Sequence, residues 1–344
     1  MTALRLATYN VEWFNALFDD RGRLFNDGER SSRYGISRAA QTAALARVFT
    51  AMDADLVMVI EAPDTNRRRS SVTALETFAA DAGLRCRRAL IGYPSDTQQE
   101  IACLFDPDRV TARHDPQGNF SGNKGSRHAP RFDATFRHDT DQDGVTDLIR
   151  WSKPPLELAV TTAQGTKLRL IGVHAKSKAP HGAIDAAEVT RLSIDNRRKS
   201  LAQCHWLRQR IDAHLTARHP LIVMGDFNDG PGLDEYEALF GRSSIEIVLG
   251  EAGATPLFDP HARQALSRRF AAMPATARFR IPPDGIYLNA LLDYIMVSPD
   301  IAAQTPRWTI WHPFDTPACY NVPALREALL AASDHFPVTL DLTL

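Results

Sequence analysis

The chain of 344 residues contains only four cysteines, and no two of them are spaced as a CxxC pair. That spacing argues against a zinc ribbon and against a small disulfide scaffold. The sequence also lacks an apolar run of the roughly 18 residues that a membrane-spanning helix needs. We therefore expect no membrane span and a fold held by a hydrophobic core, because 44% of the residues are hydrophobic.

The sequence has no excess of one charge, since 40 Lys and Arg oppose 41 Asp and Glu. This balance argues against a protein that holds long duplex nucleic acid mainly by bulk positive charge, although it allows a local basic strip. We expect no secretory leader, because strand-like sequence begins almost at once after Met1. We expect a cytoplasmic protein with reduced thiols, and a monomer, although nothing in the sequence fixes the oligomeric state.

Short apolar runs rich in β-branched residues recur along the chain and predict β-strands. They span residues 4–11, 56–60, 101–105, 156–160, 168–173, 221–224, 291–297 and 336–342. Helical patterns lie between them, and Ser37 is a candidate N-cap for one of these helices. Two polar stretches, near 118–147 and 252–285, are predicted to be loops inserted into a single domain over 1–344.

Polar residues occupy strand positions that a buried strand would not choose. They are Asn10, Glu61, His174, Asp226 with Asn228, Asp293, and Asp334 with His335. A carboxylate beside a buried strand is costly unless it is paired, hydrogen-bonded or metal-bound. Recurrence of such residues on separate strands predicts a shared cleft at one edge of the sheets.

The residue types at these positions point to metal-assisted hydrolysis at phosphorus. No serine stands in a nucleophile elbow, whereas carboxylate and amide oxygens are the ligands that suit Mg²⁺ or Mn²⁺. Histidines stabilise charge that develops on phosphoryl oxygens. An Asp beside an Asn is suited to orient and deprotonate a water molecule.

The blocks TYNVEWF, VIEAPD, GVHAKSK, GDFND, LLDYIMVS and SDHFPV follow one another along the chain. In this order they resemble the endonuclease/exonuclease/phosphatase superfamily, which includes DNase I, and the resemblance runs from Asn10 to His335. It implies a DNase I-like, four-layer α/β/β/α sandwich with the active site at one edge. Alternation of strands and helices alone would have favoured a doubly wound parallel sheet.

The resemblance implies a metal site and a catalytic water site. Glu61 matches the metal-binding glutamate, helped by Asn10 and Asp334, and the expected cofactor is Mg²⁺ or Mn²⁺. The residue before Glu61 is Ile60 where relatives carry Gln, so we expect one polar contact to be missing. Asp226 matches the aspartate that orients or deprotonates the attacking water.

The resemblance also implies contacts to the scissile phosphate, from Asn10, Asn228, His174 and His335. Asp293 matches the aspartate that orients His335. Glu100, which precedes a predicted strand, is expected to orient His174 in the same way. Lys153 and Lys176 are expected near phosphate, with Arg150 as the alternative to Lys153.

A peripheral calcium site is one interpretation of the segment DTDQDGVTD. Asp139, Asp141 and Asp143, with Gly144 at the sixth position, have the spacing of a calcium loop. Arg150 stands where such a loop carries its last glutamate. A polar surface loop without a cation is the other interpretation.

The sequence is compatible with two substrate classes. Near-neutral net charge favours short, flexible or small substrates over a long duplex, which leaves room for a small-molecule or lipid-headgroup phosphodiesterase or phosphatase, similar to sphingomyelinases or inositol phosphatases. The lysines of HAKSK and several arginine runs favour a polyanion. We expect a nuclease-like phosphodiesterase, with DNA or RNA as the substrate.

Overall fold

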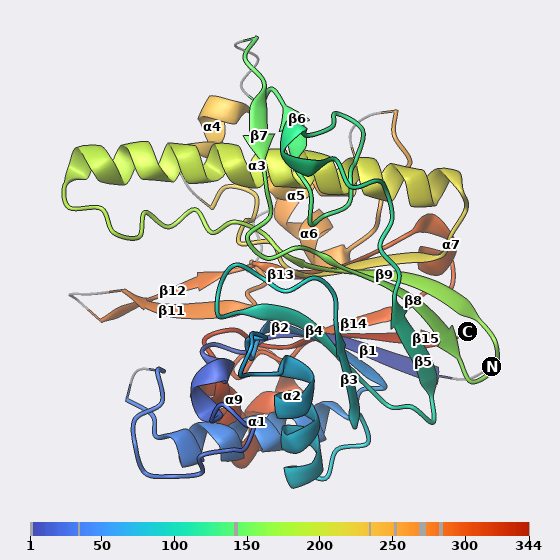
Figure 1. Cartoon of the computed structure of the whole chain (residues 1–344). Helices are drawn as coiled ribbons and strands as arrows, with labels where there is room; N and C mark the ends of the chain where they lie inside the picture. The colour runs from blue at the N-terminus through green and yellow to red at the C-terminus, as the bar shows by residue number, and fades with distance from the viewer. Residues whose placement is uncertain are drawn as a thin grey trace.

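The computed structural model describes residues 3–33, 35–140, 144–233, 235–250, 253–267, 273–281 and 285–343. Two mixed β-sheets pack face to face, and helices cover the outer face of each sheet (Figure 1). The predicted four-layer α/β/β/α sandwich is therefore confirmed. Asp141 and Asp143 of the candidate calcium loop lie outside the described residues.

The first sheet has the strand order β14-β15-β1-β2-β4-β3. Its strands are β1 (Ala3–Asn10), β2 (Leu56–Ala62), β3 (Arg88–Ile91), β4 (Glu100–Phe105), β14 (Arg307–Ile310) and β15 (Val338–Thr343). β1 and β2 run parallel at its centre, and the other pairs are antiparallel.

The second sheet has the strand order β13-β10-β9-β8-β5. Its strands are β5 (Val110–His114), β8 (Leu156–Thr162), β9 (Lys167–His174), β10 (Leu221–Asp226) and β13 (Asp293–Val297). β9 and β10 are parallel, whereas β8 and β9 form an antiparallel hairpin around Gly165, whose φ is 88°.

The central strands are buried on both faces, which explains why they appear in the sequence as continuous apolar runs. In β1, Leu4 and Leu6 belong to the core between the two sheets, whereas Ala7 and Tyr9 belong to the core under the outer helices. Successive side chains point to opposite faces of a strand, so β1 contributes to both cores.

Helices cover the outer faces of both sheets. On the first sheet lie α1 (Arg38–Met52), α2 (Ser71–Asp81), α8 (Pro317–Tyr320) and α9 (Pro323–Ala332), and on the second α3 (Ala186–Thr216), α5 (Ser244–Leu249) and α6 (Pro260–Leu266). The predicted N-cap is confirmed, because the Ser37 side chain accepts a hydrogen bond from the Ala40 amide. Short elements complete the set: η1 (Phe14–Leu17), η2 (Gly122–Lys124), α4 (Glu237–Phe240) and α7 (Pro299–Ala302).

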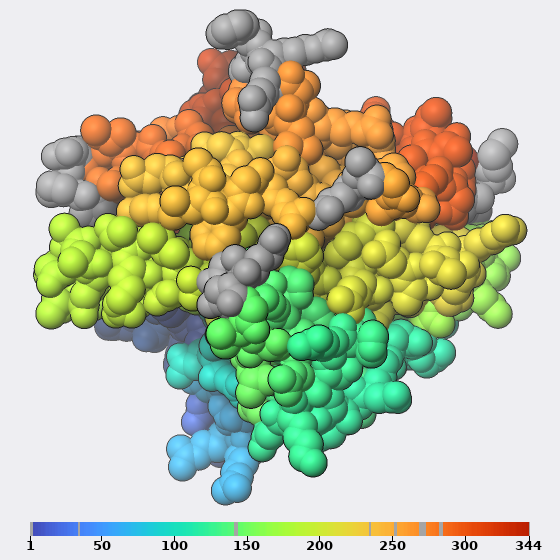
Figure 2. All heavy atoms as spheres, turned by 90° about the horizontal axis from the view of Figure 1, so that it is seen from above, coloured from blue at the N-terminus to red at the C-terminus, as the bar shows by residue number. Residues whose placement is uncertain are grey.

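The two stretches predicted as loops contain regular structure. The first holds η2 and β6 (Phe136–His138), which pairs with β7 (Asp147–Ile149). The second holds α6 and β11 (Ala277–Ile281), which pairs with β12 (Ile286–Ala290). These elements are too short to give a clear hydrophobic period. Figure 2 shows segments of the first and second stretches on opposite sides of α3.

The four cysteines are buried and free of disulfides in the described residues. Across the same residues, no helix combines the length and the apolar character needed to cross a membrane.

Candidate active site

A cleft of about 870 Å³ opens at the edge where β1, β2, β9 and β10 end. Asn10, His174 and Asp226 are the last residues of their strands, and Glu61 is the last but one of β2. All four line the cleft, and they come from both sheets. The predicted shared cleft is present because these strand ends meet at one edge of the sandwich.

Strand register places the central carboxylate. Asp226 pairs with His174 of β9 on one side and with Asp293 of β13 on the other. Gly225, next to it, has a φ of 142°, and a Cβ there would lie 2.0 Å from the Val173 carbonyl oxygen. Only glycine allows this close approach of β10 to β9.

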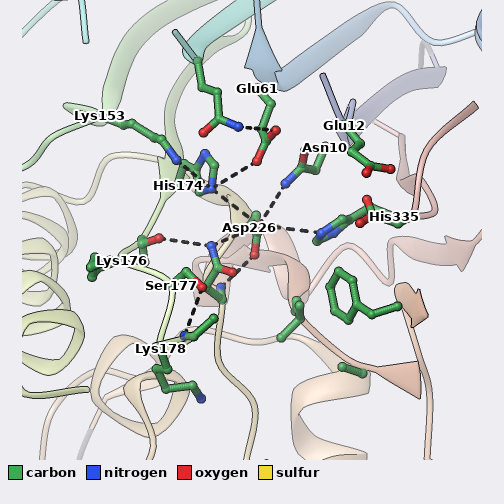
Figure 3. Close-up of a pocket in the computed structure, with 18 of the residues that line it drawn as sticks. Asn10, Glu12, Glu61, Lys153, His174, Lys176, Ser177, Lys178, Asp226 and His335 are labelled. Carbon is green, nitrogen blue, oxygen red and sulfur yellow. Dashed lines mark hydrogen bonds and ion pairs between the residues drawn. The ribbon is translucent and has the colours of Figure 1, made fainter. Parts of the chain in front are cut away.

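Asp226 is buried and accepts hydrogen bonds from two asparagines, of which Asn10 is labelled beside it in Figure 3. The Asn10 amide donates to Asp226 Oδ2 at 2.9 Å, and the Asn228 backbone N–H donates to Oδ1 at 2.7 Å. Burial raises the pKa of Asp226 to about 6. A carboxylate oriented in this way, with a raised pKa, has the properties of a general base.

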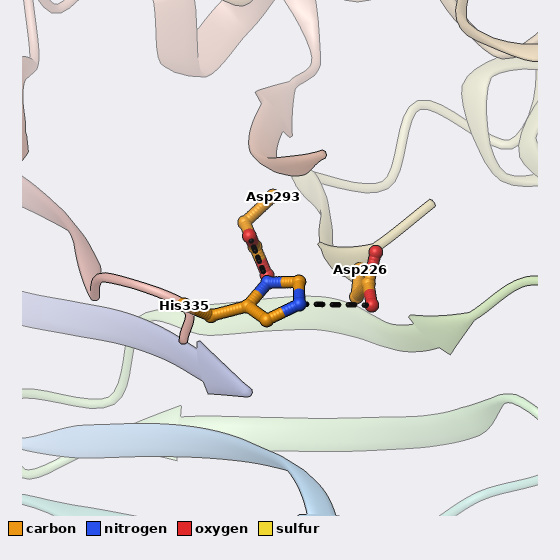
Figure 4. A group of neighbouring side chains, drawn as sticks. All are labelled: Asp226, Asp293 and His335. Atoms are coloured by element: carbon orange, nitrogen blue, oxygen red, sulfur yellow. Dashed lines mark hydrogen bonds and ion pairs between the residues drawn. The ribbon is translucent and has the colours of Figure 1, made fainter. Parts of the chain in front are cut away.

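His335 and Asp293 form a buried hydrogen-bonded pair (Figure 4). His335 Nδ1 lies 2.7 Å from Asp293 Oδ2, and its Nε2 lies 4.0 Å from Asp226 Oδ2. Burial by itself lowers the pKa of His335, but the Asp293 carboxylate raises it well above the ordinary value. The result is an imidazolium beside the cleft, which suits a phosphate partner.

His174 has a different environment. Its Nε2 lies 3.3 Å from Lys153 Nζ and 3.7 Å from Asp226 Oδ2, while its buried Nδ1 has no hydrogen-bond partner in the described residues. Burial, and then the nearby charges of Lys153 and His335, hold its pKa well below the ordinary value. The two histidines are therefore electrostatically unlike, with His174 neutral and His335 charged.

Glu100 does not contact His174, so the prediction that it orients His174 is wrong. Its carboxylate binds backbone N–H groups instead. The Glu100 carboxylate accepts hydrogen bonds from the backbone N–H groups of Thr65 at 3.0 Å and Ser95 at 2.9 Å. It therefore ties together the loops after β2 and before β4. A glutamate that precedes a predicted strand can have either role, so its place in the sequence could not distinguish a structural role from a catalytic one.

Replacing Glu100 with Ala is expected to lower stability more than catalysis. The two amide groups lose their acceptor, and each such loss costs about 1–3 kcal/mol when the group is buried. Urea unfolding and the turnover number of the folded protein are the measurements. Unchanged stability together with a hundredfold loss of turnover would restore a catalytic role for Glu100.

Glu61 and Asn10 present oxygen atoms that fit a hard divalent cation. Asn10 Oδ1 is buried and has no hydrogen-bond partner within the described ranges. Burial raises the pKa of Glu61 to about 7. Gln99 donates to Glu61 Oε2, so an amide from a different segment makes the polar contact that Ile60 cannot. Glu61 also has a φ of 60°, a strained conformation for this residue type that recurs at functional sites.

Two other acids belong to this part of the cleft. Asp334 lines it as predicted, and Glu12, which the sequence analysis did not single out, lines it too. Glu12 pairs with Arg33, and its pKa is raised by burial and then by the nearby Asp334. A cation held in this part of the cleft would offset the repulsion between these carboxylates.

A second arrangement of possible metal ligands lies within the site. Ligand atoms of Asp226, Asp293 and His335 lie within 4.8 Å of one another. The hydrogen bond between Asp293 and His335 already uses the facing atoms of that pair. Oxygen-only ligands at Glu61 and Asn10 suit Mg²⁺ better than a set that includes imidazole.

The lysines of the cleft differ in their contacts. Lys178 forms an ion pair with the buried Asp229, so it serves to hold the loop after β9. Lys153 and Lys176 line the cleft, and neither forms an ion pair in the part of the chain that the structure describes. Burial lowers the pKa of both, and the charge of Lys199 adds to this effect at Lys176. These two lysines remain available for an anion.

Ser333 is a positioning residue that the sequence analysis missed. Its hydroxyl donates to the Asn10 carbonyl at 2.8 Å and accepts from the backbone N–H groups of Glu12 at 3.1 Å and His335 at 3.2 Å. It connects the end of β1 to the segment that carries His335. Its position directly before Asp334 in the block SDHFPV was the sequence feature that could have identified it.

Comparison with known proteins agrees with this geometry. The family model described as the endonuclease/exonuclease/phosphatase family matches residues 7–335. A comparison with curated proteins found no match.

Solved structures with a similar fold include TDP2 from D. rerio, complexed with a single strand DNA product. It is 12% identical, with a TM-score of 0.50 and 100% of both chains covered. A family protein from Bacteroides thetaiotaomicron is 15% identical, with a TM-score of 0.50, and the match covers 99% of this chain and 95% of that chain. At these identities the likeness concerns the fold alone. The six ordered blocks, the sandwich and the match over residues 7–335 agree, and the chain belongs to the endonuclease/exonuclease/phosphatase family.

Proposed function

We propose that this protein is a divalent-metal-dependent phosphodiesterase of the nuclease type. Members of its family hydrolyse phosphoester bonds. The observation that carries the proposal is the buried Asp226, whose Oδ2 lies 3.7 Å from His174 Nε2 and 4.0 Å from His335 Nε2 in a cleft that Glu61 also lines. A general base, a cationic donor and a set of oxygen ligands for a divalent cation are the parts that hydrolysis of a phosphodiester needs.

Asp226 is the residue that holds and deprotonates the attacking water. The amides of Asn10 and Asn228 donate to its carboxylate, which fixes the direction of its free lone pairs. The Asn228 amide also donates to the Ala175 carbonyl at 3.1 Å, so its binding of phosphate requires exchange of one of these bonds. The main contribution of the two asparagines before substrate binds is therefore orientation of the base.

His335 and Lys153 supply positive charge to the phosphoryl oxygens. His335 Nδ1 is occupied by Asp293, which leaves Nε2 to donate toward the cleft. The ammonium of Lys153 lies on the other side of Asp226, beside His174. Each preorganised donor of this kind contributes about 10²–10³-fold to the rate of comparable reactions.

Glu61, Asn10 and Asp334 are the residues that would hold the metal ion. When bound, Mg²⁺ or Mn²⁺ would neutralise phosphate charge and stabilise the leaving oxygen. Glu12, which carries charge next to Asp334, would belong to the surroundings of the ion.

A nucleic-acid substrate is favoured by Lys153 and Lys176, which line the cleft and form no ion pair within the described residues. A neutral lipid headgroup gives no reason for two cations in one half of the cleft, whereas a polyanion does. The D. rerio TDP2 structure, with its single strand DNA product, is consistent with this choice of substrate.

The direct experiment is a substrate panel with purified protein and added Mg²⁺ or Mn²⁺. The panel contains plasmid DNA, single-stranded RNA, sphingomyelin and a chromogenic phosphodiester, with EDTA as the control for metal dependence. We expect hydrolysis of the nucleic acids and the chromogenic ester, loss of activity in EDTA, and recovery on adding metal. Full activity in excess chelator, with metal content shown to be negligible, would contradict the mechanism.

Replacing Glu61 with Gln is expected to raise the metal concentration for half-maximal activity by at least roughly 10- to 100-fold, the range typical when a residue that supports a metal ligand is changed. The substitution keeps the shape and removes the negative charge. A metal titration of activity, with Gln99→Ala as a milder comparison, is the measurement. An unchanged titration would remove Glu61 from the metal site.

A further inference from the structure

The hairpin β11–β12 has one entirely apolar face. Cross-strand pairs join Ala277 to Ala290, Phe279 to Leu288 and Ile281 to Ile286. Because side chains alternate along a strand, these six residues share one face of the ribbon. The other face carries Arg278, Arg280, Tyr287 and Asn289.

This apolar face begins at the catalytic histidine. Ala277 forms a β-bridge with His335, and the Arg278 amide donates to the Asp334 carbonyl at 2.7 Å. The ring of Phe279 stands edge-on to the His335 imidazole, with centroids 5.5 Å apart. Phe279, Leu288 and Ala290 line the cleft, so the apolar face of the hairpin forms one of its walls. Figure 1 shows the hairpin extending from the end of the sheets opposite the chain termini.

Much of this wall is exposed to solvent. Leu288 is 44% exposed, and Ile286, farther along the same face, is 64% exposed. Trp13, which also lines the cleft, is 42% exposed and has a left-handed φ of 57°. Contiguous apolar side chains left in water beside a catalytic centre mark a binding surface.

The other side of the cleft is cationic. In Figure 3, Lys153 and Lys176 lie on the His174 side of Asp226, whereas His335 and Glu12 lie on the opposite side. The cleft therefore presents two lysines on one side and apolar groups next to His335 on the other. Proteins that bind single-stranded nucleic acid combine a basic track for the backbone with apolar and aromatic platforms for the bases.

We propose that the cleft binds a single nucleic-acid strand, with the backbone along Lys153 and Lys176 and an unstacked base against Phe279 and Leu288. A duplex keeps its bases paired and stacked, so it cannot place one on this wall. The inference rests on the proposed function and adds the strandedness of the substrate and the site of the base.

The test uses a short oligonucleotide as a single strand, as a duplex, and with one abasic position moved along the strand. We expect the single strand to be cleaved with a kcat/KM about tenfold or more above that of the duplex. Loss of the base next to the cleaved bond should lower kcat/KM by roughly 5- to 100-fold, as for removal of a stacking contact. Abasic positions farther away should have smaller effects.

Variants of the apolar wall test whether the sensitivity of kcat/KM to the abasic position depends on the β11–β12 hairpin. Leu288→Ser, or Phe279→Ala as a second variant, should lower kcat/KM for the intact strand and make it insensitive to the abasic position. Leu148→Ser is the matched control, because Leu148 is 57% exposed on β7, outside the cleft lining. A thermal melt of each variant confirms folding.

Three results would overturn the inference: equal cleavage of single strand and duplex, no effect of any abasic position, or identical behaviour of Leu288→Ser and Leu148→Ser. Binding to sphingomyelin vesicles that Leu288→Ser abolishes would assign the wall to a lipid surface instead. Bis(p-nitrophenyl) phosphate, a small phosphodiester without a base, serves as a control that distinguishes failure of this inference from failure of the proposed function. Its hydrolysis without any preference among the oligonucleotides contradicts this inference alone, whereas absence of all metal-dependent hydrolysis contradicts the proposed function.

Discussion

Replacing Asp226 with Asn is expected to lower the turnover number by about 10²–10⁴-fold, as is typical for loss of a general base. The substitution keeps the volume of the side chain and removes both the base and the negative charge. The carboxylate is buried and accepts hydrogen bonds from Asn10 and Asn228, and an amide oxygen can retain part of this network. We therefore expect a folded protein that still binds phosphate-containing ligands.

The measurement is the turnover number of Asp226→Asn at saturating metal and substrate, together with a thermal melt. If Asp226 served only to form the turn after β10, Asn would replace it nearly as well, because both residue types form such turns. A variant with an unchanged melt and activity within a few-fold of the parent would show that Asp226 is structural. The assignment of the water site would then be wrong.

Replacing Asp293 with Asn, or His335 with Ala, is expected to lower turnover on the order of 10³-fold or more, and the double variant should lose little beyond that. The reason is the 2.7 Å hydrogen bond between the two buried side chains, which sets both the orientation and the charge of the imidazole. Residues that act as one unit show such non-additive losses.

The four members of this double-mutant cycle are compared in turnover and in thermal stability. Thr276→Val is a useful companion variant, because the Thr276 hydroxyl accepts the Asp293 backbone N–H at 2.9 Å and so contacts the backbone of Asp293 and not its carboxylate. We expect a smaller loss from this variant than from Asp293→Asn. Losses that simply multiply in the double variant would show that Asp293 and His335 act independently.

The sequence by itself determined the central strands, the start of α1 and the polar positions that meet in the cleft. These features have local causes, because strand length, apolar composition and capping chemistry are carried by neighbouring residues. The residues at the strand ends could be assigned to one edge since a buried strand tolerates such groups only where they find partners. The four-layer sandwich was predicted from the family resemblance, because hydrophobic periodicity alone does not distinguish it from a doubly wound sheet.

Only the tertiary structure decided which partner each of these groups has. Gln99 reaches Glu61 across 38 residues of sequence, and Asn10 reaches Asp226 across 216. Glu100 is bound by two loop amides instead of by His174. The apolar wall of β11–β12 is likewise set by strand pairing and by its bridge to His335. Hydrogen bonds and packing between distant segments depend on how two sheets stack and in which register their strands pair, and no local pattern along the chain records that arrangement.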